Sequence, residues 1–408
     1  KTIRVNVRTT SGQANSGAYY ESVSGSGRFI AFESNATNLV SGDTNGVTDV
    51  FVRDRRTHTT TRVSVRSNGN QLNDWVGYSA ISVNGRFVTY CGDASNAVQG
   101  DTNGHQDVFV HDRSTGKTTL ASVSSSGRQG NADSDYSNVS SNGRWVVFVS
   151  MASNLVRGDT NGYWDLFIRD TASGTTRLIT RAPNGTPANS DTSYIGPSSL
   201  SSDGRFVTFA SPASNLVQGD TNARTDVFVY DRETGRIRRA SVNTSGFEGN
   251  GDSSDPTTSA GGRFVVFDSS ATNLVNNDAN GAADIFIRDL VKKTTRRVSV
   301  STNEVAGNQA SRYPTVSDDG RFVAFESSAT NLVGSDTNNA SDIFVRDLAT
   351  GTTRRVSVTS AKEEADAGGD NPFLSASGKY VVFQSNSTNL VANDTNGFTD
   401  IFLRGPLR

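Results

Sequence analysis

The chain is built from seven copies of one sequence unit. Each copy contains a Gly-Arg-aromatic triplet, and successive triplets are separated by 58 residues, with one separation of 61. The triplets start at Gly27, Gly85, Gly143, Gly204, Gly262, Gly320 and, as Gly-Lys-Tyr, at Gly378. Seven units account for nearly all 408 residues, and the single insertion lies between Asn189 and Gly204. A fixed period of this length predicts one repeat architecture, so we expect residues 1–408 to form one domain.

Each unit contains four short strand patterns and no helical pattern. In the sixth unit a tight turn, Asp-Asp-Gly, separates the first two strands, and Leu-Ala-Thr-Gly separates the last two. Turn-forming residues at these places are typical of β-hairpins. The longer loop 327–341 joins the second strand to the third. The four expected strands of this unit cover residues 313–317, 321–325, 342–346 and 353–358.

The second strand of each unit is apolar on both faces, as in Phe264-Val265-Val266-Phe267. A strand sheltered on both sides has a continuous apolar run instead of an alternation. Four-stranded sheets stacked face to face around an axis provide that shelter. We therefore predict an all-β fold, a single seven-bladed β-propeller with four-stranded antiparallel blades.

The two ends of the sequence complement each other. The seventh unit stops at Arg404, after its third strand, whereas the segment Arg4-Val5-Asn6-Val7 precedes the first unit. That segment resembles the fourth strand of the sixth unit, Arg355-Val356-Ser357-Val358. We expect residues 2–8 to complete blade 7 and close the ring, because closure removes exposed sheet edges.

The repeat also resembles a known family. The run from Ser317 to Phe325 (Ser-Asp-Asp-Gly-Arg-Phe-Val-Ala-Phe), followed by Asp342-Ile-Phe-Val-Arg-Asp347, is similar to the TolB-type, WD-like β-propeller repeat, and the resemblance covers all seven units. It is closest in appearance to calcium-loop repeats of secreted bacterial proteins. The resemblance implies a propeller and a secreted, periplasmic or cell-surface location. It implies no single activity, because propellers include both binding modules and enzymes.

The longer loop of every unit carries the motif Asp-x-Asn-x-x-x-Asp. Carboxylate and amide oxygens are ligands that Ca²⁺ prefers, so we predict up to seven calcium sites, one in each blade. Their ligands are Asp43, Asn45, Asp49, Asp101, Asn103, Asp107, Asp159, Asn161, Asp165, Asp220, Asn222, Asp226, Asp278, Asn280, Asp284, Asp336, Asn338, Asp342, Asp394, Asn396 and Asp400. The alternative is a turn in which the Asp and Asn oxygens accept hydrogen bonds from the backbone.

The fourth position of this motif is Gly in five units and Asn339 in the sixth, which indicates a left-handed backbone conformation. Ala223 in the fourth unit is the exception. We therefore expect the fourth loop to be the weakest or most distorted site.

The motif loops and the segments that join successive units are expected on the same rim of the propeller. Amide-rich segments there are accompanied by aromatic residues that differ between units, and aromatic rings beside amides suit sugar binding. The possible ligand-facing aromatics are Trp75, Tyr163, Trp164, Phe247 and Phe398.

Composition excludes several classes of function. A net charge of -2 provides no basic surface for nucleic acid, and no apolar run is long enough to span a membrane. His58, His105 and His111 are not expected to converge on a metal or beside a nucleophile. We predict a monomeric, calcium-binding scaffold whose rim binds a protein or carbohydrate, and enzyme activity is less favoured. The alternatives are a polysaccharide lyase or glycosidase acting at the central cleft, and a structural spacer displayed on the cell surface.

Overall fold

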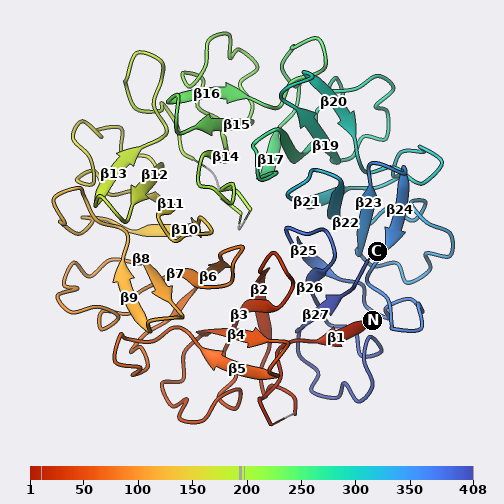
Figure 1. Cartoon of the computed structure of the whole chain (residues 1–408). Coiled ribbons are helices and arrows are strands. Elements are labelled where there is room, and N and C mark those ends of the chain that lie inside the picture. The colour runs from red at the N-terminus through yellow and green to blue at the C-terminus, as the bar shows by residue number, and fades with distance from the viewer. Residues whose placement is uncertain (11, 193–194, 197, 408) are drawn as a thin grey trace.

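The computed structural model describes residues 1–10, 12–192, 195–196 and 198–407. In that part of the chain there are 27 strands and no helix, and the strands form a closed ring of seven blades (Figure 1). The predicted seven-bladed, antiparallel β-propeller is therefore confirmed.

Each blade is numbered by its place in the sequence, and its strands run from the axis outward. The inner strands are β2 (Ala18–Val23), β6 (Val76–Ile81), β10 (Ser134–Val139), β17 (Ser253–Thr258), β21 (Ser311–Val316) and β25 (Asp370–Leu374). The second strands are β3 (Phe29–Ser34), β7 (Phe87–Gly92), β11 (Trp145–Ser150), β14 (Phe206–Ser211), β18 (Phe264–Ser269), β22 (Phe322–Ser327) and β26 (Val381–Ser385). The third strands are β4 (Asp49–Asp54), β8 (Asp107–Asp112), β12 (Asp165–Asp170), β15 (Asp226–Asp231), β19 (Asp284–Asp289), β23 (Asp342–Asp347) and β27 (Asp400–Arg404). The outer strands are β5 (Thr59–Arg62), β9 (Lys117–Leu120), β13 (Thr175–Leu178), β16 (Arg236–Arg239), β20 (Thr294–Arg297), β24 (Thr352–Arg355) and β1 (Thr2–Arg4).

Blade 4 contains the three-residue insertion. Its described strands are β14, β15 and β16, whereas the six other sheets have four strands. The inner position of blade 4 falls partly on residues outside the described ranges. On the described side, Leu200 forms an isolated antiparallel bridge with Val207 of β14.

The ring closes through strands from opposite ends of the chain. β1 pairs antiparallel with β27, with Thr2 opposite Arg404 and Arg4 opposite Phe402. The N-terminal strand therefore completes blade 7, as predicted, and the two ends of the chain lie side by side (Figure 1).

The core of each blade is a stacked aromatic pair on the second and third strands. In blade 1 the rings of Phe32 and Phe51 lie 5.8 Å apart, and both side chains are fully buried. Equivalent pairs occur in the other six blades. Burying a large side chain contributes roughly 1.5–3 kcal/mol, so these pairs explain the apolar runs in the sequence.

The Gly-Arg-aromatic triplet joins neighbouring blades. Gly85 has φ of 75°, and a Cβ atom there would lie 2.3 Å from the ring of Phe29 in the preceding blade. The ring closes in the same way, because a Cβ on Gly27 would lie 2.2 Å from Tyr380 of blade 7. The glycine therefore provides both a left-handed turn and space for the neighbour's aromatic ring.

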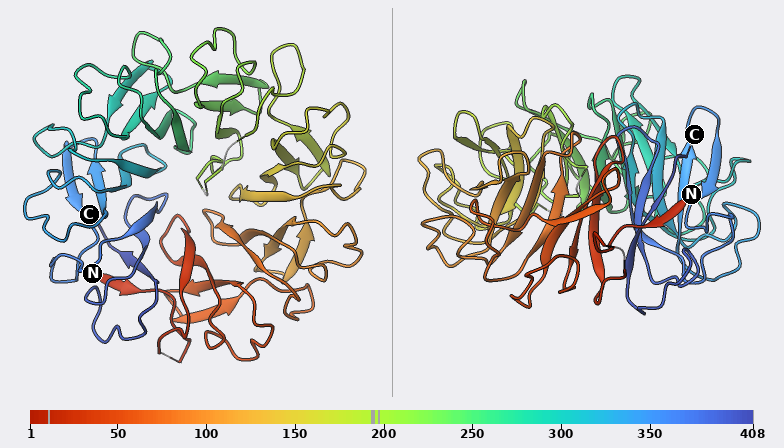
Figure 2. Two further views of the ribbon diagram at one scale, coloured as in Figure 1. Left: turned by 180° about the vertical axis from the view of Figure 1, so that it is seen from behind. Right: turned by 60° about the horizontal axis from the view of Figure 1, so that its bottom comes forward.

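The arginine of the triplet pairs with the last aspartate of the third strand. Arg28 donates to Asp54 at 2.9 and 2.6 Å, and its guanidinium lies 4.5 Å above the Phe29 ring. Blade 7 has lysine in the triplet, and Gly405 replaces the aspartate, so both partners change together. These turns mark one end of the ring, which we call the turn rim. The opposite end, where the motif loops lie, is the loop rim (Figure 2).

No helix long and apolar enough to cross a membrane was found among the described residues.

Candidate functional site

The three predicted ligand positions of each motif loop come together at the start of the third strand. In blade 1, Asp49 is fully buried and accepts hydrogen bonds from Ser64 and from the side-chain amide of Asn45. The same amide donates to the carbonyl oxygen of Leu72, in the segment that leads to blade 2. Asn103, Asn161, Asn222, Asn280, Asn338 and Asn396 make the corresponding two contacts. The motif thus ties each loop to the next blade.

An arginine lies between the two aspartates in five of the seven loops. In blade 1, Nη1 of Arg62 is 3.1 Å from Asp43 and 3.1 Å from Asp49. The equivalent residues in blades 4 to 7 are Arg239, Arg297, Arg355 and Arg4. A guanidinium therefore supplies the positive charge that the calcium prediction assigned to a metal ion, and these five loops do not fit Ca²⁺ while the arginine stays in place.

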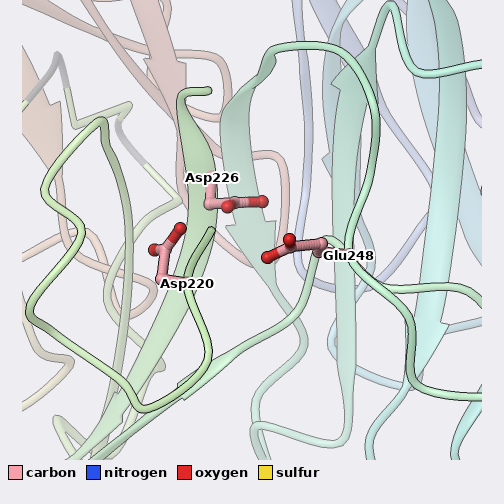
Figure 3. A group of neighbouring side chains, drawn as sticks. All are labelled: Asp220, Asp226 and Glu248. Carbon is pink, nitrogen blue, oxygen red and sulfur yellow. The ribbon is translucent and has the colours of Figure 1, made fainter. Parts of the chain in front are cut away.

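Two of the five loops also contain a third carboxylate. Glu248 joins Asp220 and Asp226, and the three carboxylates point toward one another (Figure 3). Glu364 joins Asp336 and Asp342 in the same way, and each cluster has ligand oxygens within 4.8 Å of one another, close enough to hold a metal ion.

Arginine already contacts all three carboxylates of each cluster. Nη1 of Arg239 is 2.7 Å from Glu248, 2.9 Å from Asp226 and 3.3 Å from Asp220. Burial, reinforced by Asp226 and Glu248, raises the pKa of Asp220 to about 6 even though Arg239 opposes the shift. A metal ion in either cluster would have to displace the guanidinium.

Blades 2 and 3 lack this arginine. Leu120 and Leu178 take its place, and among the described residues no ion pair reaches Asp101, Asp107, Asp159 or Asp165. Burial raises the pKa of Asp107 and of Asp165 to about 6, against hydrogen bonds from Ser122 and Thr180 respectively. These two loops fit a divalent cation better than the other five, because no arginine lies between their carboxylates. Burial raises the pKa of Asp159, and Arg181 opposes that shift without forming an ion pair with it.

The fourth motif position has the predicted left-handed conformation throughout. Its φ is 70° at Gly46, and Ala223 and Asn339 both adopt 53°. In blades 2 to 7 the motif Asn also accepts the backbone N–H two residues later, as in His105 to Asn103. These are the contacts of a hydrogen-bonded turn, which was the alternative to a calcium site in the interpretation of the sequence.

The predicted rim aromatics are not gathered into one patch. Trp75 lies beside Tyr78 with ring centres 5.7 Å apart, and Trp164 packs on the core of blades 3 and 4. Tyr163 and Phe398 are exposed on the motif loops of blades 3 and 7. Phe247 is exposed near the tip of a hairpin whose Thr244 bonds to the outer strand residue Thr295. Trp75 lies next to Tyr78, which lines the central pocket described below.

A pocket of about 410 Å³ lies on the axis of the ring, in the half of the channel nearer the loop rim. It is lined by the inner strands, and toward the turn rim the channel narrows to a space of about 50 Å³. That narrow end is lined largely by apolar side chains such as Val23, Ile81 and Val139. The pocket is therefore open mainly toward the loop rim.

Tyrosines from three successive blades form an arc on one side of this pocket. The ring centres of Tyr20 and Tyr78 are 5.0 Å apart, and those of Tyr78 and Tyr136 are 4.6 Å apart. Each tyrosine sits at a β-bulge in its inner strand, with φ of 51°, 49° and 37°. Left-handed conformations are costly for aromatic residues, so the surrounding blade must hold these rings in place. We call Tyr20, Tyr78 and Tyr136 the tyrosine arc.

The type of residue that follows each bulge differs between the two sides of the pocket. Blades 1 to 3 carry Glu21, Ser79 and Ser137, whereas blades 5 to 7 carry Pro256, Pro314 and Pro372. The side-chain oxygens of Glu21, Ser79 and Ser137 are buried and lack a hydrogen-bond partner. Buried polar atoms are normally paired, and each exception calls for an explanation such as a ligand or water. The polar half lies directly below the tyrosine arc.

Carboxyl groups form a second layer around the pocket. Burial raises the pKa of Glu33 to about 8 and that of Glu326 to about 7. Burial and the neighbouring Asp255 also raise the pKa of Asp268. Burial also raises the pKa of Glu21 well above its ordinary value, although backbone amides of Glu21 and Gln384 oppose this from longer range. The pocket thus holds carboxyl groups that keep their protons near neutral pH.

The histidines take no part in this pocket. His105 lies on the motif loop of blade 2, 3.2 Å from Asp133, and His111 is buried in β8 beside Thr118. Burial lowers the pKa of His111 to about 4. His58 lies in the turn after β4. A histidine-based metal centre in the channel therefore has no support among the described residues.

The tyrosine arc and the buried carboxyls were not predicted from the sequence. A signal was present: residues 20, 78 and 136 are one period apart and are all Tyr, whereas Asp255, Tyr313 and Asn371 occupy the same register in blades 5 to 7. Positions that differ between copies, at the axis of a ring, are where a repeat protein can hold a ligand.

No protein-family model matches the sequence, and no curated protein sequence matches it. Solved structures do match. An oligogalacturonate lyase in complex with manganese is 14% identical, covers 100% of this chain and 97% of its own, and has a TM-score of 0.55. An oligogalacturonate lyase from Vibrio parahaemolyticus is 11% identical, with 99% and 98% coverage and a TM-score of 0.51.

The matches also include a TolB protein from Agrobacterium tumefaciens, the family that the repeat motif resembles. It is 14% identical, covers 88% of this chain and 97% of its own, and has a TM-score of 0.44. At these identities the likeness concerns the fold alone, and function has to be argued from the site.

Proposed function

We propose that this protein is a binding module whose ligand enters the central pocket from the loop rim. The observation that carries the proposal is the set of buried, unpaired oxygens of Glu21, Ser79 and Ser137 below the tyrosine arc. A ligand with hydroxyl or amine groups completes their hydrogen bonds, which removes the cost of leaving buried polar atoms unpaired.

The ligand class that fits this pocket best is carbohydrate. Aromatic rings offer flat apolar faces to a sugar, while hydroxyl and carboxyl groups bond to its edges. The volume of 410 Å³ falls within the range of roughly 300–1,000 Å³ found for small-molecule pockets. The pocket therefore accepts a short stretch of a sugar chain and not a folded domain. A protein partner, the other class expected from the sequence, would have to use the loop rim around the pocket.

A second candidate function is glycoside hydrolysis in the same pocket. A glycosidase needs one carboxyl that is protonated at neutral pH as its general acid. Glu21 lines the pocket, and burial raises its pKa well above the ordinary value, so it meets this requirement. A binding module and a glycosidase give the same binding result but differ in whether products accumulate.

Calcium binding is proposed for two loops in place of seven. Blades 2 and 3 offer Asp101 with Asp107 and Asp159 with Asp165, and neither pair has an arginine between its carboxylates. We expect calorimetric titration to saturate near two calcium ions. The paired substitution Asp107→Asn with Asp165→Asn is expected to abolish this binding, whereas Asp49→Asn, in a loop that has an arginine, is expected to leave it unchanged. Saturation near seven ions would contradict this assignment.

The setting proposed for this activity is outside the cytoplasm, in secreted, periplasmic or cell-surface form, and the protein is proposed to act as a monomer forming one domain. The location follows from the repeat resemblance. The monomeric state follows from the ring, which the chain already closes through its own two ends. Sedimentation analysis tests the monomer, and fractionation of the native cell tests the location.

The test of the main proposal is a binding screen with neutral, acidic and basic oligosaccharides. Tyr78→Ala removes the middle ring of the arc, so we expect it to lose at least tenfold in affinity. Tyr163→Ala, which removes an exposed aromatic on the loop rim, serves as the matched control. Mass spectrometry of the incubated sugars separates binding from hydrolysis. Equal loss in both variants, or no binding of any oligosaccharide, would refute the central pocket as a glycan site.

A further inference from the structure

The charge around the central pocket is unbalanced. Seven carboxyl groups line or surround it: Glu21, Glu33, Asp135, Asp255, Asp268, Glu326 and Asp370. They lie close enough to perturb one another, since Glu33 and Asp370 raise the pKa of Glu21, and Asp135 raises that of Glu33. Among the described residues, the one basic side chain that acts on this group is Arg312, which affects Asp255, Asp268 and Glu326 in blades 5 and 6.

The carboxylates of the motif loops differ from those of the pocket in having arginine partners. Five of their seven aspartate pairs contain an arginine within 3.3 Å. No such partner reaches Glu21 or Glu33, which are both 4% exposed. A buried carboxylate without a cation is costly, and Glu21 and Glu33 therefore hold their protons in the free protein. A ligand can supply positive charge in place of the proton of Glu21, whereas Glu33 already accepts a hydrogen bond from the backbone N–H of Ser79.

A metal ion is a poor source of that charge. Among the described residues, the groups of three metal-binding side chains lie in the motif loops of blades 4 and 6, and none includes a carboxyl of the central pocket. The pocket carboxyls are spread around a space of about 410 Å³. An organic cation spans such a space, whereas a single ion does not.

The tyrosine arc supplies the second half of a cation site. Its rings lie edge to face or tilted, with centres 4.6 to 5.0 Å apart, and Trp75 extends the arc beyond Tyr78. The negative face of an aromatic ring attracts ammonium groups, and the attraction is stronger when water is excluded. Aromatic rings on one side and a buried carboxyl that can lose its proton on the other form a recognition site for an amine.

We propose that the ligand of the central pocket is an amine-bearing sugar, whose ammonium group lies against the tyrosine arc and pairs with Glu21. This inference rests on the proposed glycan-binding function and specifies its ligand. Polar oxygens of Ser79 and Ser137 then bond to the hydroxyl or ammonium groups of the same sugar residue. An anionic sugar is disfavoured, because it would add negative charge beside Glu21 and Glu33.

The experiment compares three trisaccharides that differ in charge: glucosamine, N-acetylglucosamine and galacturonic acid trimers. Calorimetry is carried out near neutral pH, so that the ammonium group of a glucosamine unit can replace the proton that Glu21 holds in the free protein. We expect the glucosamine trimer to bind at least tenfold more tightly than the N-acetylglucosamine trimer, and the galacturonic acid trimer to bind most weakly.

Glu21→Gln tests the assigned carboxyl. The substitution keeps the volume but leaves no carboxyl that can lose a proton, so it is expected to abolish the preference for glucosamine while the neutral trimer still binds. Glu233→Gln, an exposed residue on the turn rim that pairs with Arg205, is the control. Removing an unpaired buried carboxyl is not expected to destabilise the fold, and thermal melts check this.

The outcomes separate the two proposals. Equal or tighter binding of the neutral trimer, lost in Tyr78→Ala, overturns the amine assignment and leaves the glycan site standing. A glucosamine preference that survives Glu21→Gln also overturns the assignment. Failure of all three trimers to bind removes both this inference and the proposed function.

Discussion

Arg62 at the end of β5 forms a 3.1 Å ion pair with Asp49 at the start of β4, and both side chains are shielded from solvent. The pair occurs in five blades, and in the other two a leucine at the end of the outer strand takes the place of the arginine. The motif therefore occurs in two forms within this chain, one in which an arginine guanidinium pairs with the aspartates and one in which it does not. The difference can be tested by converting the first form into the second.

Arg239→Leu copies the blade 2 and blade 3 arrangement into blade 4. Because it leaves three carboxylates without a partner, we expect a loss of about 3–5 kcal/mol in the free energy of unfolding when a chelator is present. Calcium is expected to restore part of that stability, since Asp220, Asp226 and Glu248 remain as ligands. Thermal melts in calcium and in chelator measure both effects. Arg128→Leu, at an exposed position, is the control, and a calcium response equal to that of this control would refute the exchange of arginine for metal.

Gly85→Ala is expected to be far more damaging than Gly100→Ala. Both glycines are left-handed, with φ of 75° and 84°, so both substitutions incur a backbone cost of roughly 1–2 kcal/mol. A Cβ on Gly85 also meets the Phe29 ring of the preceding blade, whereas nothing lies within 4 Å of a Cβ on Gly100. Crowding adds about 1–3 kcal/mol. Urea unfolding of the two variants isolates the contact between blades, and equal losses would show that the ring does not need this space.

Stability is expected to fall as the pH rises from about 6.5 to 8. Burial raises the pKa of Glu33 to about 8 and that of Glu326 to about 7, and it also raises the pKa of Asp268, so the folded protein binds more protons than the unfolded chain in this window. Their favourable contribution is complete below the unfolded pKa of about 4 and is lost as the pH passes the folded value. His111 is neutral in both states over most of this range.

The measurement for this prediction is the melting temperature as a function of pH. Glu33→Gln should flatten the decline, because its amide cannot release a proton, and Glu233→Gln should leave the decline unchanged. An unaltered profile in Glu33→Gln would mean that this carboxyl titrates as an exposed group.

Removal of residues 1–8 is expected to open the ring. It deletes β1, exposes the edge of β27, and breaks the contacts of Arg4 with Asp394 and of Asn6 with Asp400. Exposed strand edges pair with other chains, so size-exclusion chromatography should show dimers or larger species. A synthetic peptide of residues 1–8 should restore the monomer by adding the missing strand. Arg4→Leu, which keeps the strand, is the control, and a truncated chain that stays monomeric without the peptide would argue against closure by β1.

The fold was predictable because its determinants repeat. The same structural role recurs in each blade for the glycine of the triplet, the apolar second strand and the fourth-strand segment, as at Gly27 and residues 4–7. Because a pattern that is unclear in one copy is clear in another, the strand positions, the number of blades and the ring closure could be inferred from the sequence. The boundaries of the outer strand were less accurate: the sixth was expected at 353–358 and is Thr352–Arg355.

The central site was not predictable by the same reasoning. Uniformity of the Asp-x-Asn-x-x-x-Asp motif drew attention to calcium, whereas in the structure the motif of blade 1 is also bound by Ser64, Arg62 and the backbone of the next blade. Arg62 and Ser64 follow the motif by more than ten residues along the chain and meet it only across the hairpin. The pocket residues vary between blades, and only the ring geometry brings Tyr20, Tyr78 and Tyr136 together.

The terminal segments hold each other directly, since the amino group of Lys1 lies 3.1 Å from the carbonyl oxygen of Gly405, and the N–H of Gly405 bonds back to Lys1. A short linker between them would turn the chain into a covalent circle without moving a blade. Such a circle could be reopened at the exposed turn between the third and outer strands of another blade. The order of blades along the gene is thus separable from their order around the axis, and no blade has to come first.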